Sequence, residues 1–156
     1  MFDASRENDL VRALLASCCE QVLETMFFSS PLDPTEPPLS TGQARVHSRL
    51  AFRGRPAGAF EVDADPQVSR HLAASFLGLA EADVSPQQVI DVLGEFANMA
   101  CGSALSSLAR VEYFHLDPPQ TAAVDCFTPS IKGVRRAFVL EGGTLGVCLR
   151  VEFDPE

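Results

Sequence analysis

Residues 85–110 read SPQQVIDVLGEFANMACGSALSSLAR, and this stretch decides how the rest of the chain is interpreted. Ser85 is a favourable N-cap residue and Pro86 suits the first helical position, so we expect a helix from Ser85 to Arg110. At about 100° per residue, one face of this helix gathers Asp91, Glu95, Asn98 and Gly102. The opposite face gathers Val89, Leu93, Phe96 and Ala100. The stretch therefore predicts an amphipathic helix with an apolar core face and a polar outer face.

The whole chain has the composition of an ordinary globular domain. Its 156 residues are 46% hydrophobic and 21% charged, and they carry a net charge of -9. This length allows one sizeable core, so we expect a single domain over residues 1–156. The negative charge disfavours nonspecific binding to nucleic acid or to an anionic membrane surface, because both attract basic patches.

Nothing in the sequence predicts a membrane segment or a secretory signal. No apolar run approaches the ~20 residues that a membrane-spanning helix needs. The first ten residues, MFDASRENDL, lack the basic start and apolar centre of a signal peptide. We therefore expect a cytoplasmic protein.

The cysteines and histidines do not form a recognisable metal or disulfide pattern. The cysteines are odd in number and show no CxxC spacing; they are Cys18, Cys19, Cys101, Cys126 and Cys148. The histidines are far apart, at His47, His71 and His115. We expect the cysteines to be small buried hydrophobic residues in a reducing compartment, and we expect no zinc site.

A second amphipathic helix is predicted at the N-terminus, from Asn8 or Asp9 to about Phe28. Its Glu20 and Glu24 lie four residues apart, like the acids of the later helix. Phe27, however, stands where the later helix has Asn98. This first helix therefore lacks the amide, and we interpret it as a packing helix.

The remaining segments predict a connector and several strands. Residues 29–42 contain four prolines, which favour an extended surface connector. Strands are predicted at 44–53, 58–63, 111–116, 122–127, 135–141 and 144–153, and a short helix runs from Asp65-Pro66 to Gly78. Gly142-Gly143 is typical of a hairpin turn. In the last strand, Leu145, Val147, Leu149, Val151 and Phe153 are expected to point inward, with Cys148, Arg150 and Glu152 outward.

The first strand carries a row of arginines at positions 45, 49, 53 and 55, opposite Val46, Ser48, Leu50 and Phe52. This row could contact an anion, but we prefer the interpretation as a solvated strand face. Strands cluster in hairpins instead of alternating with helices. This order favours an α+β fold with a mostly antiparallel sheet and helices on one face.

Common self-contained active sites are absent from the sequence. There is no glycine-rich phosphate loop, no GxSxG and no HExxH. A Cys-His pair has no supporting pattern. A two-carboxylate hydrolase built on Asp91 and Glu95 is conceivable, but such acids normally face each other across a cleft from different elements.

The pattern Asp91-x3-Glu95-x2-Asn98 resembles the signature of the CheC/CheX/FliY phosphatases of bacterial chemotaxis. Those proteins carry an Asp or Ser, a Glu and an Asn at this spacing on an exposed helix, usually followed by a downstream proline. In that family the proline stands some twenty-two positions after the Asn. Here the candidates, Pro118 and Pro119, stand a few residues closer to Asn98 than that. CheC members carry two such helices and CheX members one, so the single motif is similar to CheX.

This resemblance implies a CheC-like fold and a phosphatase that acts on a phosphorylated CheY-like receiver domain. It implies that Asn98 orients the attacking water and that Glu95 docks on the receiver lysine. Asp91 would support the contact, while Gly102 and Ala97 would let the helix approach. The resemblance also implies a homodimer, with Mg²⁺ supplied by the receiver and no cofactor in this chain.

Two interpretations remain open on this basis. Asp, Glu and Asn on the outer face of a helix are also what any solvated face contains. The alternative to catalysis is a receiver-binding or scaffolding module in a two-component or flagellar signalling pathway.

Overall fold

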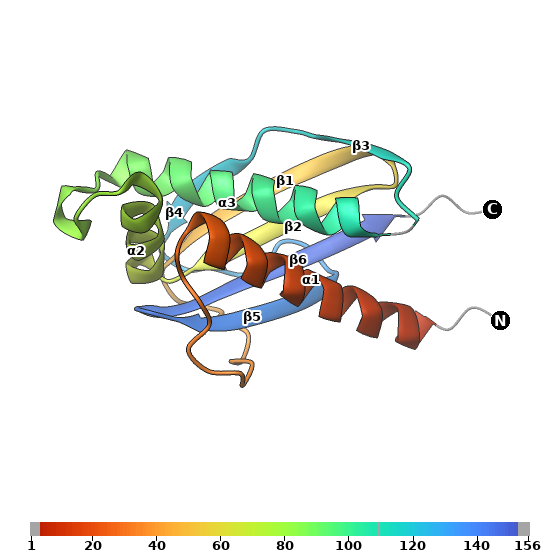
Figure 1. The fold of residues 1–156 in the computed structure, drawn as a ribbon, viewed down its shortest axis with the longest axis horizontal. Coiled ribbons are helices and arrows are strands. Elements are labelled where there is room, and N and C mark those ends of the chain that lie inside the picture. Colours follow the sequence, from red (N-terminus) through yellow and green to blue (C-terminus); the bar gives the residue numbers. More distant parts are fainter. Residues whose placement is uncertain (1–3, 109, 153–156) are drawn as a thin grey trace.

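A computed structural model describes residues 4–108 and 110–152. It contains three α-helices, namely α1 (Ala4–Met26), α2 (Pro66–Leu77) and α3 (Pro86–Ser107), with a short 3-10 helix η1 (Glu81–Asp83) before α3. The strands are β1 (Arg45–Arg55), β2 (Ala57–Ala64), β3 (Tyr113–Leu116), β4 (Gln120–Val124), β5 (Val134–Leu140) and β6 (Gly143–Glu152). Their arrangement is shown in Figure 1.

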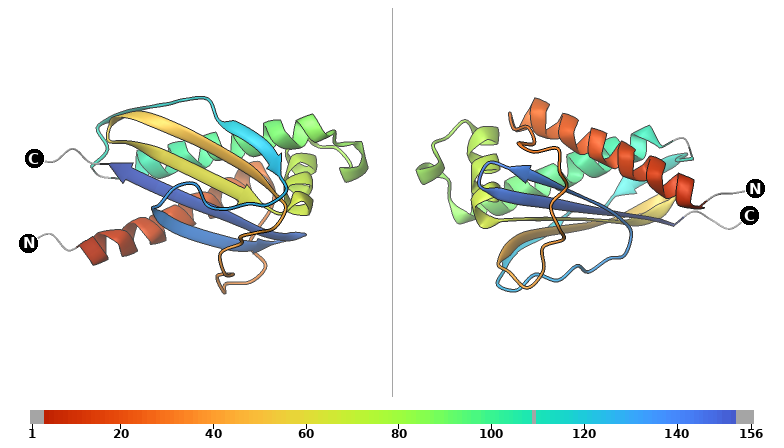
Figure 2. Two further views of the ribbon diagram at one scale, coloured as in Figure 1. Left: turned by 180° about the vertical axis from the view of Figure 1, so that it is seen from behind. Right: turned by 90° about the horizontal axis from the view of Figure 1, so that it is seen from below.

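The strands form one antiparallel sheet in the order β3-β1-β2-β6-β5, and β4 also pairs with β1. Helices α1 and α3 lie side by side across one face of this sheet, and α2 stands near one end (Figures 1 and 2). The α+β class, the antiparallel sheet and the placement of the helices on one face are confirmed.

Helix α3 begins as the sequence predicts. The Ser85 side chain accepts a hydrogen bond from the Gln88 backbone N–H (3.1 Å), and the Ser85 backbone N–H donates to the Gln88 side chain (2.9 Å). This capping box satisfies two backbone donors and fixes the start of the helix. The helix ends at Ser107, so the predicted end at Arg110 is wrong.

Helix α1 also differs from its predicted bounds, because it starts at Ala4 and ends at Met26. Phe28 takes a left-handed conformation, with φ at 53°, which stops the helix. Phe27 is fully buried; its ring stacks on Phe76 with centroids 5.0 Å apart, and it meets the edge of Phe96 at 5.5 Å. The position that corresponds to Asn98 is therefore a core position directly after α1.

The face of the sheet away from the helices is less solvated than the sequence predicts. Figure 2 shows the segment between β4 and β5 crossing this face, with the proline-rich connector near the β5 edge. Arg45 is only 2% exposed and pairs with Asp63 (2.7 Å) and Asp65 (2.9 Å), so its prediction as part of a solvated row is wrong. Cys148, expected on the outward face of β6, is buried there beside Ile131. Four of the cysteines are buried as expected, but Cys126 is exposed, so the expected burial is wrong for that residue.

The strand bounds differ in two informative places. Strands β3 and β4 both pair with β1, and residues 117–119 interrupt what could otherwise be one strand. The two prolines there lack the N–H that a continuous ladder needs. In the last hairpin, Leu140 pairs with Gly143, so the turn residues are Glu141 and Gly142 instead of the two glycines. Phe153 lies outside the described residues.

Candidate functional site

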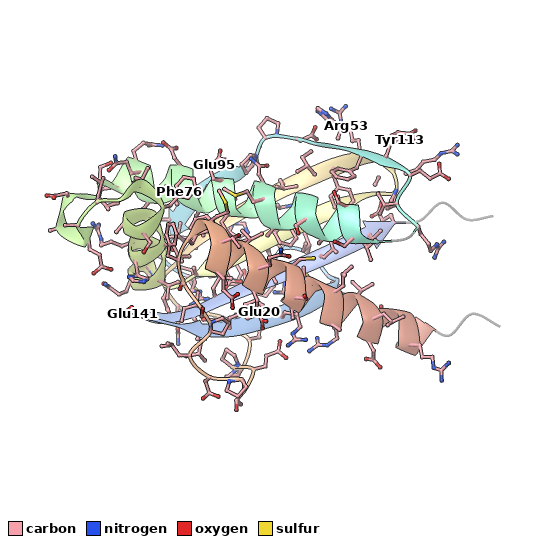
Figure 3. All side chains as sticks on the ribbon, viewed as in Figure 1. Glu20, Arg53, Phe76, Glu95, Tyr113 and Glu141 are labelled. Carbon is pink, nitrogen blue, oxygen red and sulfur yellow. The ribbon has the colours of Figure 1, made fainter. Side chains whose placement is uncertain are left out.

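The polar face of α3 lies on the surface of the helical layer. Asp91 and Glu95 are exposed, while Asn98 and Gly102 are partly exposed. Figure 3 labels Glu95 in the half of α3 that is nearer to α2. The structure therefore brings the four predicted residues together on one accessible helical face.

Within the described part of the chain, no hydrogen bond or ion pair engages the Glu95 carboxylate or the Asn98 amide. Asp91 differs, because its Oδ1 accepts a hydrogen bond from Gln87 Nε2 one turn earlier (2.8 Å). Polar groups without an internal partner are available to another molecule. Glu95 and Asn98, three residues apart, lie about one turn from each other on the helix.

The backbone behind these side chains is held firmly. Leu93, Phe96 and Ala100 are at most 2% exposed, which confirms most of the predicted core face. Val89, the fourth member, is also buried. Ala97 is fully buried as well, so its predicted place on the approach surface is wrong. This packing keeps α3 from rotating and so fixes the direction of its polar face.

The helix face by itself forms an open surface. A half-open pocket of about 230 Å³ lies elsewhere, between the connector and the far side of the sheet, and its lining includes Arg45, Asp63 and Gly146. Among the described residues, no group of His, Cys, Asp and Glu is arranged to hold a metal ion. The arrangement of a carboxylate and an amide on a rigid helix can donate and accept hydrogen bonds.

The sequence gives no indication of a second polar cluster on the far face of the sheet. The buried Glu61 carboxylate accepts hydrogen bonds from His47 Nε2 (2.9 Å) and the Ser130 backbone N–H (3.0 Å), and Arg135 lies 3.2 Å away. The Ser130 hydroxyl also donates to it. Burial raises the pKa of Glu61, but the hydrogen bonds from His47 and Ser130 outweigh burial and lower this pKa to about 2. This cluster fastens the segment between β4 and β5 to the sheet.

Solved structures with the same fold come from chemotaxis proteins. A CheX protein from Desulfovibrio desulfuricans has a TM-score of 0.71 at 23% identity, with 91% of this chain and 99% of that chain covered. CheX from Vibrio vulnificus has a TM-score of 0.73 at 20% identity, with 90% and 95% covered. A CheX–CheY–BeF3–Mg complex from Borrelia burgdorferi has a TM-score of 0.67 at 17% identity, with 90% and 96% covered. The fold and its exposed helix therefore define a CheC-like α+β domain.

The family follows from the sequence match. The family model described as chemotaxis phosphatase CheX matches residues 46–135, more than half of the chain. The chain belongs to the CheX family. No curated protein sequence matches it. Among the described residues, no helix has the length and apolar character needed to cross a membrane.

Proposed function

We propose that this protein is a phosphatase that hydrolyses the aspartyl phosphate of a CheY-like receiver domain. Membership of the CheX family supports this proposal, and so does the likeness to a solved CheX that is bound to CheY. The observation that carries it is the pair of Glu95, which is exposed, and Asn98, which is partly exposed, both without partners among the described residues on a rigid helix. In this proposal the receiver holds the phosphate, and α3 supplies the part of the active site that the receiver lacks.

Asn98 orients the attacking water. Its amide can accept a hydrogen bond from water and donate one to the phosphoryl group without changing its own charge. The water oxygen forms a bond to phosphorus while the bond from phosphorus to the aspartyl oxygen breaks. The products are the free aspartate carboxylate and inorganic phosphate, which takes up the proton. Holding the water in line is the main contribution that such a reaction needs from a second protein.

Glu95 docks α3 on the receiver. Its carboxylate can pair with a lysine of the receiver in a charge-assisted contact, which fixes the register of Asn98 one turn later. Asp91 lies one turn before Glu95 and accepts a hydrogen bond from Gln87. It therefore acts at the edge of the contact between α3 and the receiver. Gly102 carries no side chain on the same face and lets the partner approach closely. Mg²⁺ belongs to the receiver and neutralises charge on the phosphoryl oxygens there.

The experiment that tests this proposal measures how fast a phosphorylated receiver loses its phosphate. Purified receivers from the same genome are phosphorylated, and the loss of phosphate is followed with and without this protein. We expect one receiver to lose its phosphate faster in proportion to the protein added. Binding without any change in phosphate lifetime would contradict catalysis and favour the alternative of a receiver-binding or scaffolding module.

The homodimer implied by the family resemblance is also a proposal. Part of the far face of the sheet is open to a second copy, since Arg49, Ala51 and Arg53 on β1 are exposed there. Sedimentation equilibrium of the purified protein tests this directly. We expect a mass twice that of the 16.8 kDa chain, and a single-chain mass at all concentrations would contradict it.

A further inference from the structure

Helix α3 is closely contacted at Gly94, the residue directly before Glu95. A methyl group added at Gly94 would lie 3.2 Å from Thr121 Oγ1 and 3.3 Å from Pro119 Cγ. These distances are shorter than ordinary van der Waals contacts to carbon. Gly94 has an ordinary helical backbone, so the close approach of residues 119–121 is what favours a glycine here; an alanine would displace these neighbours by a few tenths of an ångström. Glycine in a helix interior costs about 1 kcal/mol relative to alanine, so its presence needs such a reason.

The segment that touches Gly94 is anchored to the sheet on both sides. The Asp117 backbone N–H donates to the Ala51 carbonyl of β1 (2.9 Å). Thr121 Oγ1 lies 2.8 Å from the hydroxyl of Ser48, which is fully buried in β1. Pro119 lies between these two attachments and has a restricted backbone. The segment is therefore a firm support for α3.

Asn98 lies on the same strip of α3 as this contact. Gly94, Asn98 and Gly102 are four residues apart in turn, so they follow one another along the helix. Leu116 Cδ1 approaches the Gly102 end of the strip, at 3.8 Å from an added methyl group. Figure 1 shows the chain between β3 and β4 running beside α3. Residues 116–121 thus lie against this strip on either side of Asn98, but only Gly94 is approached more closely than an ordinary van der Waals contact.

We propose that Gly94 is a positioning residue for the reaction. Its missing side chain lets Pro119 and Thr121 rest against α3, and this contact sets the place of Asn98 relative to the phosphoryl group. The inference rests on the proposed phosphatase function. Because the geometry of the attacking water controls the rate, displacing Asn98 by a few tenths of an ångström should lower turnover more than binding.

The test compares Gly94→Ala with Gly94→Ala/Pro119→Ala. Alanine at 119 keeps the Cβ atom, 3.8 Å from the added methyl group, and removes the Cγ atom at 3.3 Å. We expect Gly94→Ala to lower kcat about tenfold, with KM changed less than about twofold and an unfolding midpoint no lower than wild type. The double variant should recover part of this loss relative to Pro119→Ala, because the Pro119 Cγ contact is removed while Thr121 Oγ1 stays 3.2 Å from the added methyl group. Ser106→Ala, an exposed change on the same helix, controls for increased helix propensity and should retain wild-type kcat.

Three results would overturn the proposal. The first is a Gly94→Ala protein with kcat within about twofold of wild type, and the second is an equal loss whether residue 119 is proline or alanine. The third is a Gly94→Ala chain that unfolds while the double variant folds, because the contact would then serve stability alone.

A second readout separates this inference from the proposed function. If wild type fails to speed phosphate loss, the phosphatase proposal fails, but NMR of the free protein still tests the positioning. We expect the Asn98 side-chain amide resonances to shift in Gly94→Ala and to move part of the way back in the double variant, in which only the Thr121 contact remains. Unmoved Asn98 resonances would overturn the positioning role.

Discussion

Glu61 offers the sharpest test of how the far face of the sheet is held together. This carboxylate has no exposed surface, and it is charged at neutral pH because His47 and Ser130 donate hydrogen bonds to it. Its pKa falls from an ordinary value of 4.5 to about 2 on folding. At about 1.4 kcal/mol for each tenfold change in proton affinity, this difference contributes on the order of 3 kcal/mol to stability at pH 7.

The pH dependence has a defined sign. The folded chain binds the Glu61 proton less readily than the unfolded chain, so the stabilisation is complete well above pH 4.5 and declines as pH falls toward 2. About 2 kcal/mol should be lost by pH 3. Replacing Glu61 with glutamine removes this titration and leaves a neutral side chain beside Arg135.

Urea unfolding at pH 7, 5, 4 and 3 measures the effect. We expect Glu61→Gln to be less stable than wild type by on the order of 3 kcal/mol at pH 7, with the gap narrowing to about 1 kcal/mol at pH 3. Glu112→Gln is the matched control, because Glu112 is 65% exposed and lies 3.8 Å from Arg55. A constant gap between wild type and Glu61→Gln across this pH range would refute the reasoning.

Three further outcomes follow from the packing. Phe27→Ala should lower the free energy of unfolding by about 3–5 kcal/mol in urea titrations, because a fully buried ring is lost; a loss under about 1 kcal/mol would contradict its core role. Asp63→Asn should lower the free energy of unfolding by about 3–5 kcal/mol in the same assay, because Arg45 then loses a buried carboxylate at 2.7 Å. Unchanged stability would show that the ion pair is not formed. A thiol reagent at neutral pH should modify Cys126 alone quickly, because the other four cysteines are buried and burial raises the pKa of Cys101 to about 12; rapid reaction of a second thiol would contradict that burial.

The main helix could be predicted from sequence because several local signals agree there. Ser85, Pro86 and Gln88 mark its start, and the helical spacing separates Phe96 from Glu95. Each of these signals depends on residues within a few positions of one another. The packing role of Phe27 was predictable for the same reason, since the position that matches Asn98 carries an aromatic ring there, directly after α1.

The far face of the sheet could not be predicted, because its burial depends on contacts distant in sequence. Alternation along β1 and β2 places Arg45, Glu61 and Asp63 on the face of the sheet that points away from the helices. The pattern alone predicts that these side chains are exposed to solvent. Ser130 comes 69 residues after Glu61 and covers it. The close approach of Pro119 to Gly94 is equally invisible to periodicity, because it requires β3 and β4 to pair with the same strand.

The central claim is that Asn98 orients the water that attacks a receiver aspartyl phosphate. Its most direct test is the dephosphorylation rate of the cognate receiver with wild type, Asn98→Ala and, as a control, Glu24→Ala, an exposed acid of α1. We expect Asn98→Ala to lose at least about a hundredfold in kcat, with fold and receiver binding retained, and Glu24→Ala to match wild type. An Asn98→Ala protein that dephosphorylates the receiver at the wild-type rate would contradict the claim.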